Sequence, residues 1–339
     1  MSIGGARVVD LHAHAVLEET LGAAGEHGPE LGVAPDGRPL FRVGGYRLHG
    51  VRYRGSPFMD VELRIAAMDR AAIDFQVLSP NPLTYFHFID LPSAVAFCRR
   101  HNDALSALVR RHPARLAGLA ALPMQSPTAA ADELTRAVRE LGLWGACIGT
   151  EFGTRLDAPD MDPFYGRCIE LDVPLFLHPA PAGIDGPSAF PAVDRFDLDL
   201  LVGFAAQETV AVATLIYGGV LDRHPALDVC VSHGGGAIGF LFGRFDEAAL
   251  KRPWSNGALR EPGAFKARLK RLWFDNHVHS AASLALLEDI VGRERMVFGT
   301  NFAGWDQPAG GGAVTAPPWL ADNARRLLRQ PNLMRSRPS

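Results

Sequence analysis

Residues 7–14 read Arg-Val-Val-Asp-Leu-His-Ala-His, an apolar run that ends in two histidines. The run predicts a short buried strand over residues 7–11. Because side chains alternate between the two faces of a strand, His12 and His14 point the same way, at or just past its end. Two neighbouring imidazoles make half of a metal site, since neutral imidazole is a common ligand for divalent ions. A pair of surface histidines is the alternative, so the positions of the other histidines decide between the two.

Short apolar runs alternate with longer amphipathic segments along the whole chain. The predicted strands cover residues 7–11, 75–79, 116–122, 145–149, 174–177, 227–232, 272–275 and 296–299. The predicted helices cover residues 60–73, 91–112, 127–141, 161–171, 198–221, 237–250, 281–292 and 319–328. Eight strand–helix repeats in about 300 residues are what a (β/α)8 TIM-like barrel of the α/β class requires. A doubly wound parallel sheet is the structural alternative.

Residues 22–57 interrupt this alternation, because they are rich in Gly, Pro and Arg and hold only short β-like pieces at 39–43 and 46–53. An insertion between the first strand and its helix lies at the C-terminal face of a barrel, where it can cover an active site. We therefore expect one barrel over residues 1–329 with a small β-rich insertion, followed by a flexible tail over residues 330–339.

The composition narrows the possible partners. The chain has 339 residues, 47% of them hydrophobic, and a formal net charge of −3, which does not favour nucleic acid or an anionic membrane surface. Its four cysteines form no CxxC pair, so we expect buried free thiols and a cytoplasmic, reducing location. We see no N-terminal signal pattern, and the apolar stretch around residues 210–217 looks too short to span a bilayer.

Polar residues follow the later predicted strands at the point where each strand ends. They are His178 after the fifth strand, His233 after the sixth, His277 and His279 after the seventh, and Asn301 after the eighth. In a barrel the C-terminal ends of the strands converge on one mouth, which is where barrel enzymes keep their chemistry. The remaining histidines lie in predicted loops and helices, and we expect them to be structural or solvated.

The sequence resembles the amidohydrolase superfamily, in the branch of aminocarboxymuconate-semialdehyde decarboxylase and related aromatic-acid decarboxylases. The matching motifs are Val-Asp-Leu-His-Ala-His at 9–14, Phe-Arg-Val at 41–43, Met-Asp at 68–69, Gly-Leu-Ala-Ala-Leu-Pro-Met-Gln-Ser-Pro at 118–127, Ile-Gly-Thr at 148–150, Leu-His-Pro at 177–179, His-Gly-Gly-Gly at 233–236, Gly-Arg at 243–244, Asp275 with His279, and Phe-Gly-Thr at 298–300. Together they cover nearly the whole chain.

The resemblance implies a role for each matched residue. His12, His14 and His178 would be metal ligands, and His233 the catalytic histidine beside the metal or a further ligand. Arg42 and Arg244 would grip a substrate carboxylate, as planar guanidinium groups do well. An exposed loop charge is the alternative for Arg42, and an ion pair along a helix face is the alternative for Arg244. One such arginine can come from a neighbouring subunit, so we expect a homodimer.

The sequence departs from the family pattern after the eighth strand. The relatives carry an acidic residue there, and this chain has Asn301. An amide can offer its oxygen as a weak metal ligand, but it neither offsets metal charge nor accepts a proton from bound water. Asp306 is close enough in sequence to fold back and replace the missing carboxylate, or it is simply a loop residue. Asn301 therefore leaves open a metal-poor variant with altered chemistry.

We expect one divalent ion, with Zn favoured and Mn as the alternative, because the fourth predicted strand lacks the lysine that bridges binuclear amidohydrolase sites. In this hypothesis His233 transfers the proton in a non-oxidative decarboxylation of an aromatic or unsaturated carboxylic acid. His279 orients it, and Phe86 and Trp305 wall the pocket. A mononuclear hydrolase of a carbon–carbon or amide bond is the alternative function.

Overall fold

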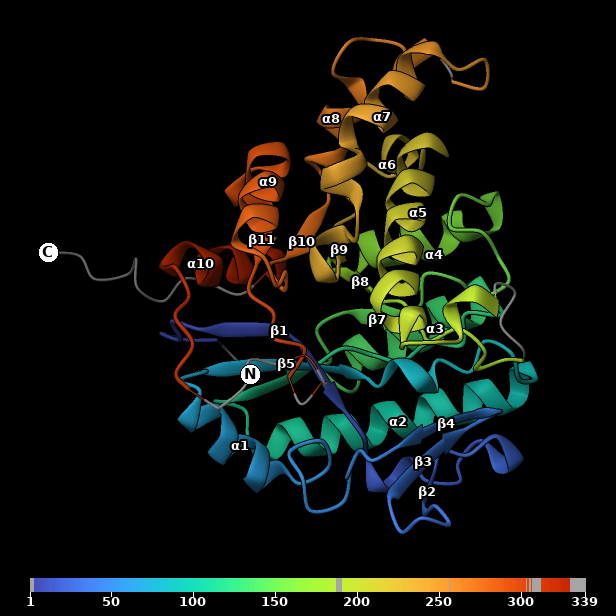
Figure 1. The fold of residues 1–339 in the computed structure, drawn as a ribbon, viewed down its shortest axis with the longest axis vertical. Helices are drawn as coiled ribbons and strands as arrows, with labels where there is room; N and C mark the ends of the chain where they lie inside the picture. The colour runs from blue at the N-terminus through green and yellow to red at the C-terminus, as the bar shows by residue number, and fades with distance from the viewer. Residues whose placement is uncertain are drawn as a thin grey trace, which may run out of the picture.

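A computed structural model describes residues 3–186, 191–255, 257–302, 304, 306 and 312–329 of the protein. Its centre is a set of parallel strands (Figure 1): β1 Val9–Ala15, β5 Phe75–Pro80, β6 Leu116–Gly118, β7 Ala146–Ile148, β8 Leu175–Leu177, β9 Val229–Val231, β10 Trp273–Asp275 and β11 Met296–Val297. They pair in the order β1-β5-β6 and β7-β8-β9-β10-β11. Parallel bridges Ala120↔Ala146 and Asp10↔Phe298 join the two groups at both seams. The predicted α/β barrel is therefore confirmed.

Each barrel strand is followed by a helix, and the observed helices lie close to the predicted ones. They are α1 Val61–Arg70, α2 Leu91–Arg111, α3 Pro127–Arg139, α4 Asp162–Glu170, α5 Phe204–Tyr217, α7 Ile238–Lys251, α9 Ala281–Val291 and α10 Pro318–Leu327. The side chains of Asp60, Asp90, Ser126 and Ser280 cap α1, α2, α3 and α9 by accepting backbone N–H bonds. Short 3-10 turns lie at Glu18–Thr20, Gly25–His27, Pro82–Thr84, Pro159–Met161, Pro191–Val193, His233–Gly235, Gly257–Leu259 and Arg293–Arg295.

The segment predicted as one helix over residues 198–221 is broken into three pieces. A π-helical turn Asp199–Gly203 leads into α5, and α6 Val220–Arg223 follows. Gly219 separates the last two because its left-handed backbone, with φ of 70°, ends the helix. The short helix α8 Ala264–Leu269 was not predicted, since six residues are too few to give a clear period.

The insertion is an antiparallel sheet of β2 Glu30–Val33, β3 Pro39–Val43 and β4 Tyr46–His49. Phe41 and Val43 are fully buried in a cluster that includes Phe97 of α2. Figure 1 shows this sheet at the end of the barrel towards which β1 runs. The predicted piece at 39–43 matches β3, the piece at 46–53 ends early at His49, and β2 was missed.

Alternation along the strands divides the core into an inner and an outer layer. In β8, Phe176 belongs to the cluster inside the barrel, while Leu175 and Leu177 belong to the cluster between the barrel and its helices. In β9, Cys230 takes the same inner place. The four cysteines are buried and free, as predicted. The barrel interior is thus packed, and chemistry is confined to its mouth.

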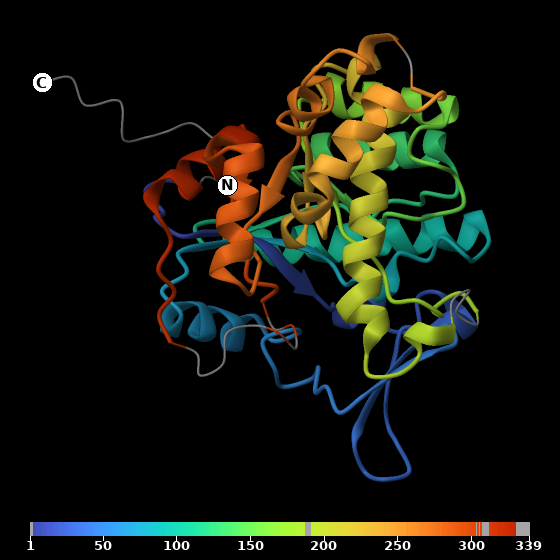
Figure 2. The same cartoon turned by 45° about the horizontal axis from the view of Figure 1, so that its top comes forward.

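Within the described ranges, one helix is long and apolar enough to cross a membrane by length and composition, the 19-residue stretch Asp199–Tyr217. The predicted apolar stretch around residues 210–217 is thus part of a longer apolar helix that begins at Asp199. Figure 2 shows the helix lying along the barrel. Its side chains at Val212, Leu215 and Ile216 are buried in the outer core layer, so the helix is a structural part of the barrel.

Candidate active site

Three histidines meet at the mouth of the barrel. His12 and His14 lie on β1, and His178 follows β8 directly. One ring nitrogen from each lies within 4.8 Å of the others. The Nε2 atoms of all three are buried and have no hydrogen-bond partner among the described residues. A buried polar atom without a partner costs free energy, so three of them converging on one point fit a bound cation.

The Nδ1 atom of each of these rings has a hydrogen-bond partner. His12 Nδ1 lies 2.7 Å from Asp275 Oδ2, His14 Nδ1 lies 3.1 Å from the Pro80 carbonyl, and His178 Nδ1 lies 2.7 Å from the Pro179 carbonyl. Because these partners accept hydrogen bonds, Nδ1 carries the hydrogen and the lone pair is left on Nε2. This is how carboxylates and carbonyls orient histidine ligands around metals.

Burial also sets the charge of these rings. It lowers the pKa of His12 to about 4, although Asp275 acts in the opposite direction. It lowers the pKa of His14 and of His178 well below the ordinary value of 6.5. All three rings are therefore neutral at pH 7, which is the form that binds a metal.

A buried network below the histidines fixes the strands that carry them. Asp10 Oδ1 accepts hydrogen bonds from the backbone N–H of His12 at 3.0 Å and of Thr300 at 3.1 Å. Asp10 Oδ2 accepts from Gln76 Nε2 at 2.9 Å, and Arg64 donates both to Gln76 Oε1 and to the His14 carbonyl. Asp10 thereby links β1, which carries His12 and His14, to the segment at Thr300 that follows β11.

His233 lies beside the three histidines and is paired with a residue that sequence reasoning missed. Its ring centre is 4.8 Å from that of His12 and 5.0 Å from that of His178. Its Nδ1 lies 2.7 Å from Oε1 of Glu208, a fully buried carboxylate on α5. Burial alone lowers the pKa of His233, but Glu208 outweighs it and raises that pKa to about 9. The one signal for Glu208 in the sequence is a lone acid within an apolar helix.

Asp306 folds back onto the site and joins a second polar cluster. Its Oδ2 accepts from His277 Nε2 at 2.9 Å and from His279 Nε2 at 3.1 Å, and its Oδ1 accepts from Asn301 Nδ2 at 2.6 Å. The turn depends on Gly304, because a Cβ there would lie 2.6 Å from Asn301 Nδ2. The carboxylate that the family pattern has at position 301, and that this chain lacks there, is therefore present next to Asn301, supplied by Asp306.

Two cavities open beside the histidines. The first, of about 140 Å³, is lined by His14, His178 and Asn301 on the barrel side. The insertion and the segment before α5 supply its other walls, which include Tyr46, Leu48, Tyr53, Phe58, Leu200 and Phe204. The second, of about 230 Å³, is lined by His233, Glu208, His277, His279, Asn301 and Asp306. Asn301, Leu200 and Phe204 border both cavities.

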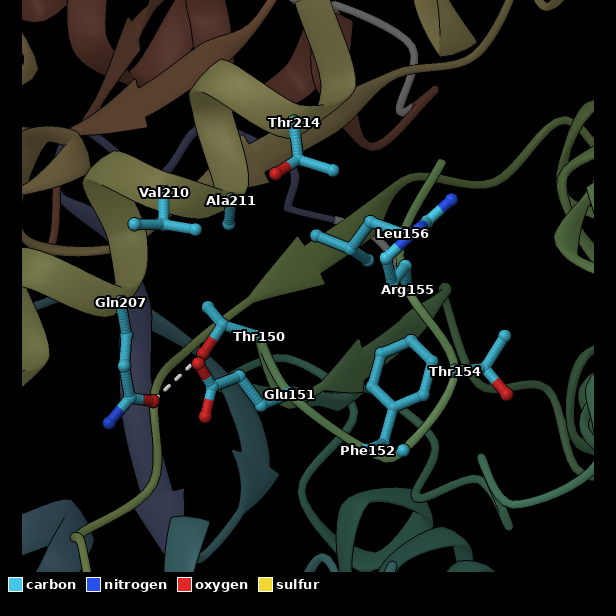
Figure 3. Close-up of a pocket in the computed structure, with 11 residues that line it drawn as sticks. Thr150, Glu151, Phe152, Thr154, Arg155, Leu156, Gln207, Val210, Ala211 and Thr214 are labelled. Carbon is cyan, nitrogen blue, oxygen red and sulfur yellow. Dashed lines mark hydrogen bonds between the residues drawn. The ribbon is translucent and has the colours of Figure 1, made fainter. Parts of the chain in front are cut away.

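A third cavity, of about 260 Å³, lies between the loop after β7 and the outer face of α5 (Figure 3). Thr150 Oγ1 and Gln207 Oε1 are 2.9 Å apart on its wall. Glu151 and Arg155 also line it, and Arg155 is paired with Asp157 at 3.1 Å. This cavity holds none of the histidines and stands apart from the candidate site.

The structure does not bring the remaining predicted residues to the histidines. Arg42 donates to Glu30 Oε2 at 3.0 Å and to two backbone carbonyls, and it lines neither the 140 Å³ nor the 230 Å³ cavity. Arg244 lies exposed on α7. Phe86 is fully buried in the core cluster under the insertion, so it does not wall the pocket. Trp305 lies outside the described residues, as does the predicted tail.

A barrel with converging neutral histidines at the C-terminal ends of its strands defines the class of metal-dependent barrel enzymes. The family described as Amidohydrolase matches residues 9–330. The chain belongs to this family, as the motifs predicted.

Known proteins similar to this chain are named as decarboxylases. The chain is 32% identical over 244 residues to the 2-amino-3-carboxymuconate-6-semialdehyde decarboxylase of Dictyostelium discoideum, a match that covers 72% of this chain and 66% of that protein, just under two thirds of its length. Among solved structures, the apo form of the Metarhizium anisopliae IDCase superposes with a TM-score of 0.81 at 23% identity, covering 97% and 98% of the two chains.

A second solved structure shares the fold. The dihydroxybenzoic acid decarboxylase of Polaromonas sp. holds manganese and the inhibitor 2-nitroresorcinol, and it superposes with a TM-score of 0.70 at 24% identity, covering 95% and 96% of the chains. The three-histidine cluster agrees with the predicted divalent metal site. The names of the similar proteins agree with the predicted class of enzyme.

Proposed function

We propose that this protein is a metal-dependent decarboxylase of an aromatic or unsaturated carboxylic acid. The observation that carries the proposal is the convergence of three buried, unpartnered Nε2 atoms, from His12, His14 and His178, beside a cavity walled by aromatic side chains. Histidine nitrogens suit zinc, and manganese is the alternative. The oxygen of Asn301 is the fourth protein ligand in this proposal, since its Nδ2 is already used by Asp306.

A divalent ion at this place supplies positive charge that stabilises negative charge developing on substrate oxygens. The protein's own residues do the rest. Tyr46 and Tyr53 of the insertion, with Phe58 and Phe204, give a cavity of about 140 Å³ an aromatic wall that suits a planar ring. They place the ring beside His14 and His178, and Asn301, Leu200 and Phe204 border both this cavity and the one that His233 lines.

His233 is the proton donor in this proposal. Glu208 raises the pKa of His233 and accepts its Nδ1 hydrogen, so the proton on Nε2 is the one available for transfer. The proton goes to the ring carbon that bears the carboxylate. The bond from that carbon to the carboxylate then breaks, its electron pair returns to the ring, and carbon dioxide leaves. Neutral His233 takes up a proton again from solvent.

Asp306 and His279 support this step as positioning residues. Asp306 accepts hydrogen bonds from the Asn301 amide, His277 and His279. It therefore holds in place the side chains that line the 230 Å³ cavity together with His233. Because Asp306 carries the negative charge that Asn301 lacks, it balances part of the positive charge of a bound cation at short range.

We further propose a cytoplasmic homodimer in which α7 contributes to the interface. Phe240 on this helix is 84% exposed, and Arg244 lies one turn further along it. The proposal rests on the family resemblance, in which such an arginine can come from a neighbouring subunit, and Phe240 is the apolar side chain that a partner would cover. In this dimer, Arg244 of one subunit would reach the carboxylate of a substrate bound to the other subunit. Light scattering of the purified protein, with Phe240→Asp as the interface variant, tests the oligomeric state.

The test of the function is release of carbon dioxide by protein loaded with Zn²⁺ or Mn²⁺, measured on a panel of ortho-hydroxybenzoates and muconate semialdehydes. We expect turnover of at least one class, loss of turnover after chelation, and loss in a His178→Ala variant. Loaded protein that releases no carbon dioxide but cleaves an amide or a carbon–carbon bond with uptake of water would overturn the proposal in favour of a hydrolase.

A further inference from the structure

We propose that His277, His279 and Asp306 form a second, weaker binding site for a divalent cation, next to the three-histidine site. The proposal deepens the proposed function, because both sites would face the same substrate. Two imidazole nitrogens and one carboxylate oxygen converge here, and the ligand atoms all lie within 4.8 Å of one another. Two histidines with one carboxylate are a common ligand set for zinc, manganese and iron.

The distances fit coordination as well as hydrogen bonding. Asp306 Oδ2 lies 2.9 Å from His277 Nε2 and 3.1 Å from His279 Nε2. Ligand atoms that each lie about 2.1 Å from one ion, at angles near 90°, are about 3 Å apart. An ion would replace the two hydrogens now shared with the carboxylate, and it would lie beside the two N···O lines, so each ring would turn to direct its lone pair at the ion.

The side chains around the cluster leave room for the ion and for its remaining ligands. Asp306 and His277 are almost fully buried, with exposed side-chain fractions of 9% and 6%, while His279 is 61% exposed and leaves a path to solvent. The cluster borders the 230 Å³ cavity. The ring centre of His277 lies 5.6 Å from that of His12 and 5.7 Å from that of His233.

The charged side chains that line the 230 Å³ cavity indicate what a second cation would do there. No lysine or arginine lines the 140 Å³ or the 230 Å³ cavity among the residues that the structure describes. The larger cavity instead holds two carboxylates, Asp306 and Glu208, and Glu208 Oε2 is buried with no hydrogen-bond partner in the described chain. Glu208 is paired with His233, so Asp306 is the carboxylate whose charge would repel an anionic substrate in this cavity. A cation on Asp306 offsets that repulsion and offers a contact for a second oxygen of the substrate.

The arrangement also explains why this site would be the weaker one. The three-histidine site presents lone pairs that are already free, whereas the second site must first give up two hydrogen bonds to Asp306. It therefore fills only after the first, at higher concentration of the ion.

Equilibrium dialysis of the full-length protein against rising Zn²⁺ or Mn²⁺, followed by elemental analysis, tests the proposal without any assay of turnover. We expect two ions per chain in the native protein, filling in two steps. His279→Ala should bind one ion with the affinity of the first step. The matched control His49→Ala, an exposed histidine on β4, should keep both.

Three results would overturn the second site: native protein that saturates at one ion, a His279→Ala variant that keeps two, or one that loses both. A His14→Ala variant separates this proposal from the proposed function. It should lose the tight ion and keep the weak one, and full retention of the tight ion would contradict the three-histidine site instead.

Discussion

The two histidine clusters at the barrel mouth use the same side chain in opposite ways. In the cluster of His12, His14 and His178, each Nδ1 is held by the protein and each Nε2 is buried without a partner. In the cluster of His277 and His279, each Nε2 is already bonded to Asp306. The first arrangement is costly unless a ligand is bound, whereas the second is satisfied by itself. The difference indicates that the first cluster is built for an ion and that the second adapts to one.

The largest effect should come from removing a ligand of the first cluster. His14→Ala should take the metal content of the tight site to near zero and lower the decarboxylation rate by at least about 100- to 1,000-fold, the scale of losing a charge stabiliser in a transition state. Elemental analysis and a carbon dioxide assay measure both. A variant that keeps both its tight ion and its rate would break the comparison, because the free lone pairs would then have no role.

The next effect concerns the ion pair between His233 and Glu208. The pKa of His233 rises from 6.5 to about 9 in the folded protein. The pair therefore contributes stability that is complete below about pH 6.5 and is lost as the pH rises through about 9. Glu208→Gln should lower the free energy of unfolding of the metal-free protein by about 3 kcal/mol at pH 6, and by much less at pH 10.

Urea unfolding at the two pH values checks this prediction. A loss of stability that is the same at pH 6 and pH 10 would show that Glu208 acts through packing or through Ser232, and not through the charge of His233. Asp132→Asn, at an exposed position on α3, serves as a control for the loss of one carboxylate.

A smaller effect should follow from changing the orientation of a ligand while the ligand stays in place. Asp275 accepts from His12 Nδ1 at 2.7 Å and from the backbone of Gly234 and His277. Asp275→Asn should weaken the tight ion by about 10- to 100-fold, as the loss of an outer partner of a histidine ligand does. Competition with a chelator measures the affinity. An unchanged affinity would mean that the fold alone orients His12.

The smallest effect is expected at Arg42. Its guanidinium is bonded to Glu30 and to backbone carbonyls of the insertion. Because exposed ion pairs contribute little, Arg42→Ala should leave kcat/KM within about twofold and Tm within about 2 °C of the native values. A rise in KM of about tenfold or more would show that Arg42 leaves Glu30 to bind the substrate carboxylate, as the family resemblance implied.

Much of the site could be predicted because it follows from the barrel. Once eight strand–helix repeats are recognised, every residue that directly follows a strand is brought to the same mouth. His12 and His14 lie in the C-terminal half of β1, and His178 and His233 come within two residues of the ends of β8 and β9. The structure places their rings 4.6–5.1 Å apart where they contact. The outer limits of the strands were less certain, because the apolar runs extend beyond the paired residues.

Contacts between separate elements could not be predicted in the same way. Glu208 reaches His233 from a helix, so no strand-end rule points to it. Arg42 lies directly opposite Glu30 in the register of β2 and β3, and cross-strand pairing of opposite charges gives it a partner away from the site. Phe86 is drawn into the core below the insertion, because burial of a large aromatic side chain outweighs any use it has at the surface.

The sequence by itself determined the barrel, the family and the set of histidines at its mouth, because periodic burial and the geometry of strand ends are local properties of the chain. The tertiary structure decided which atoms of those histidines are free, which carboxylate accompanies Asn301 and which arginine is already paired. These depend on hydrogen bonds between residues far apart in sequence, such as His12 with Asp275 and His233 with Glu208, and only the packing of one element on another brings such partners together.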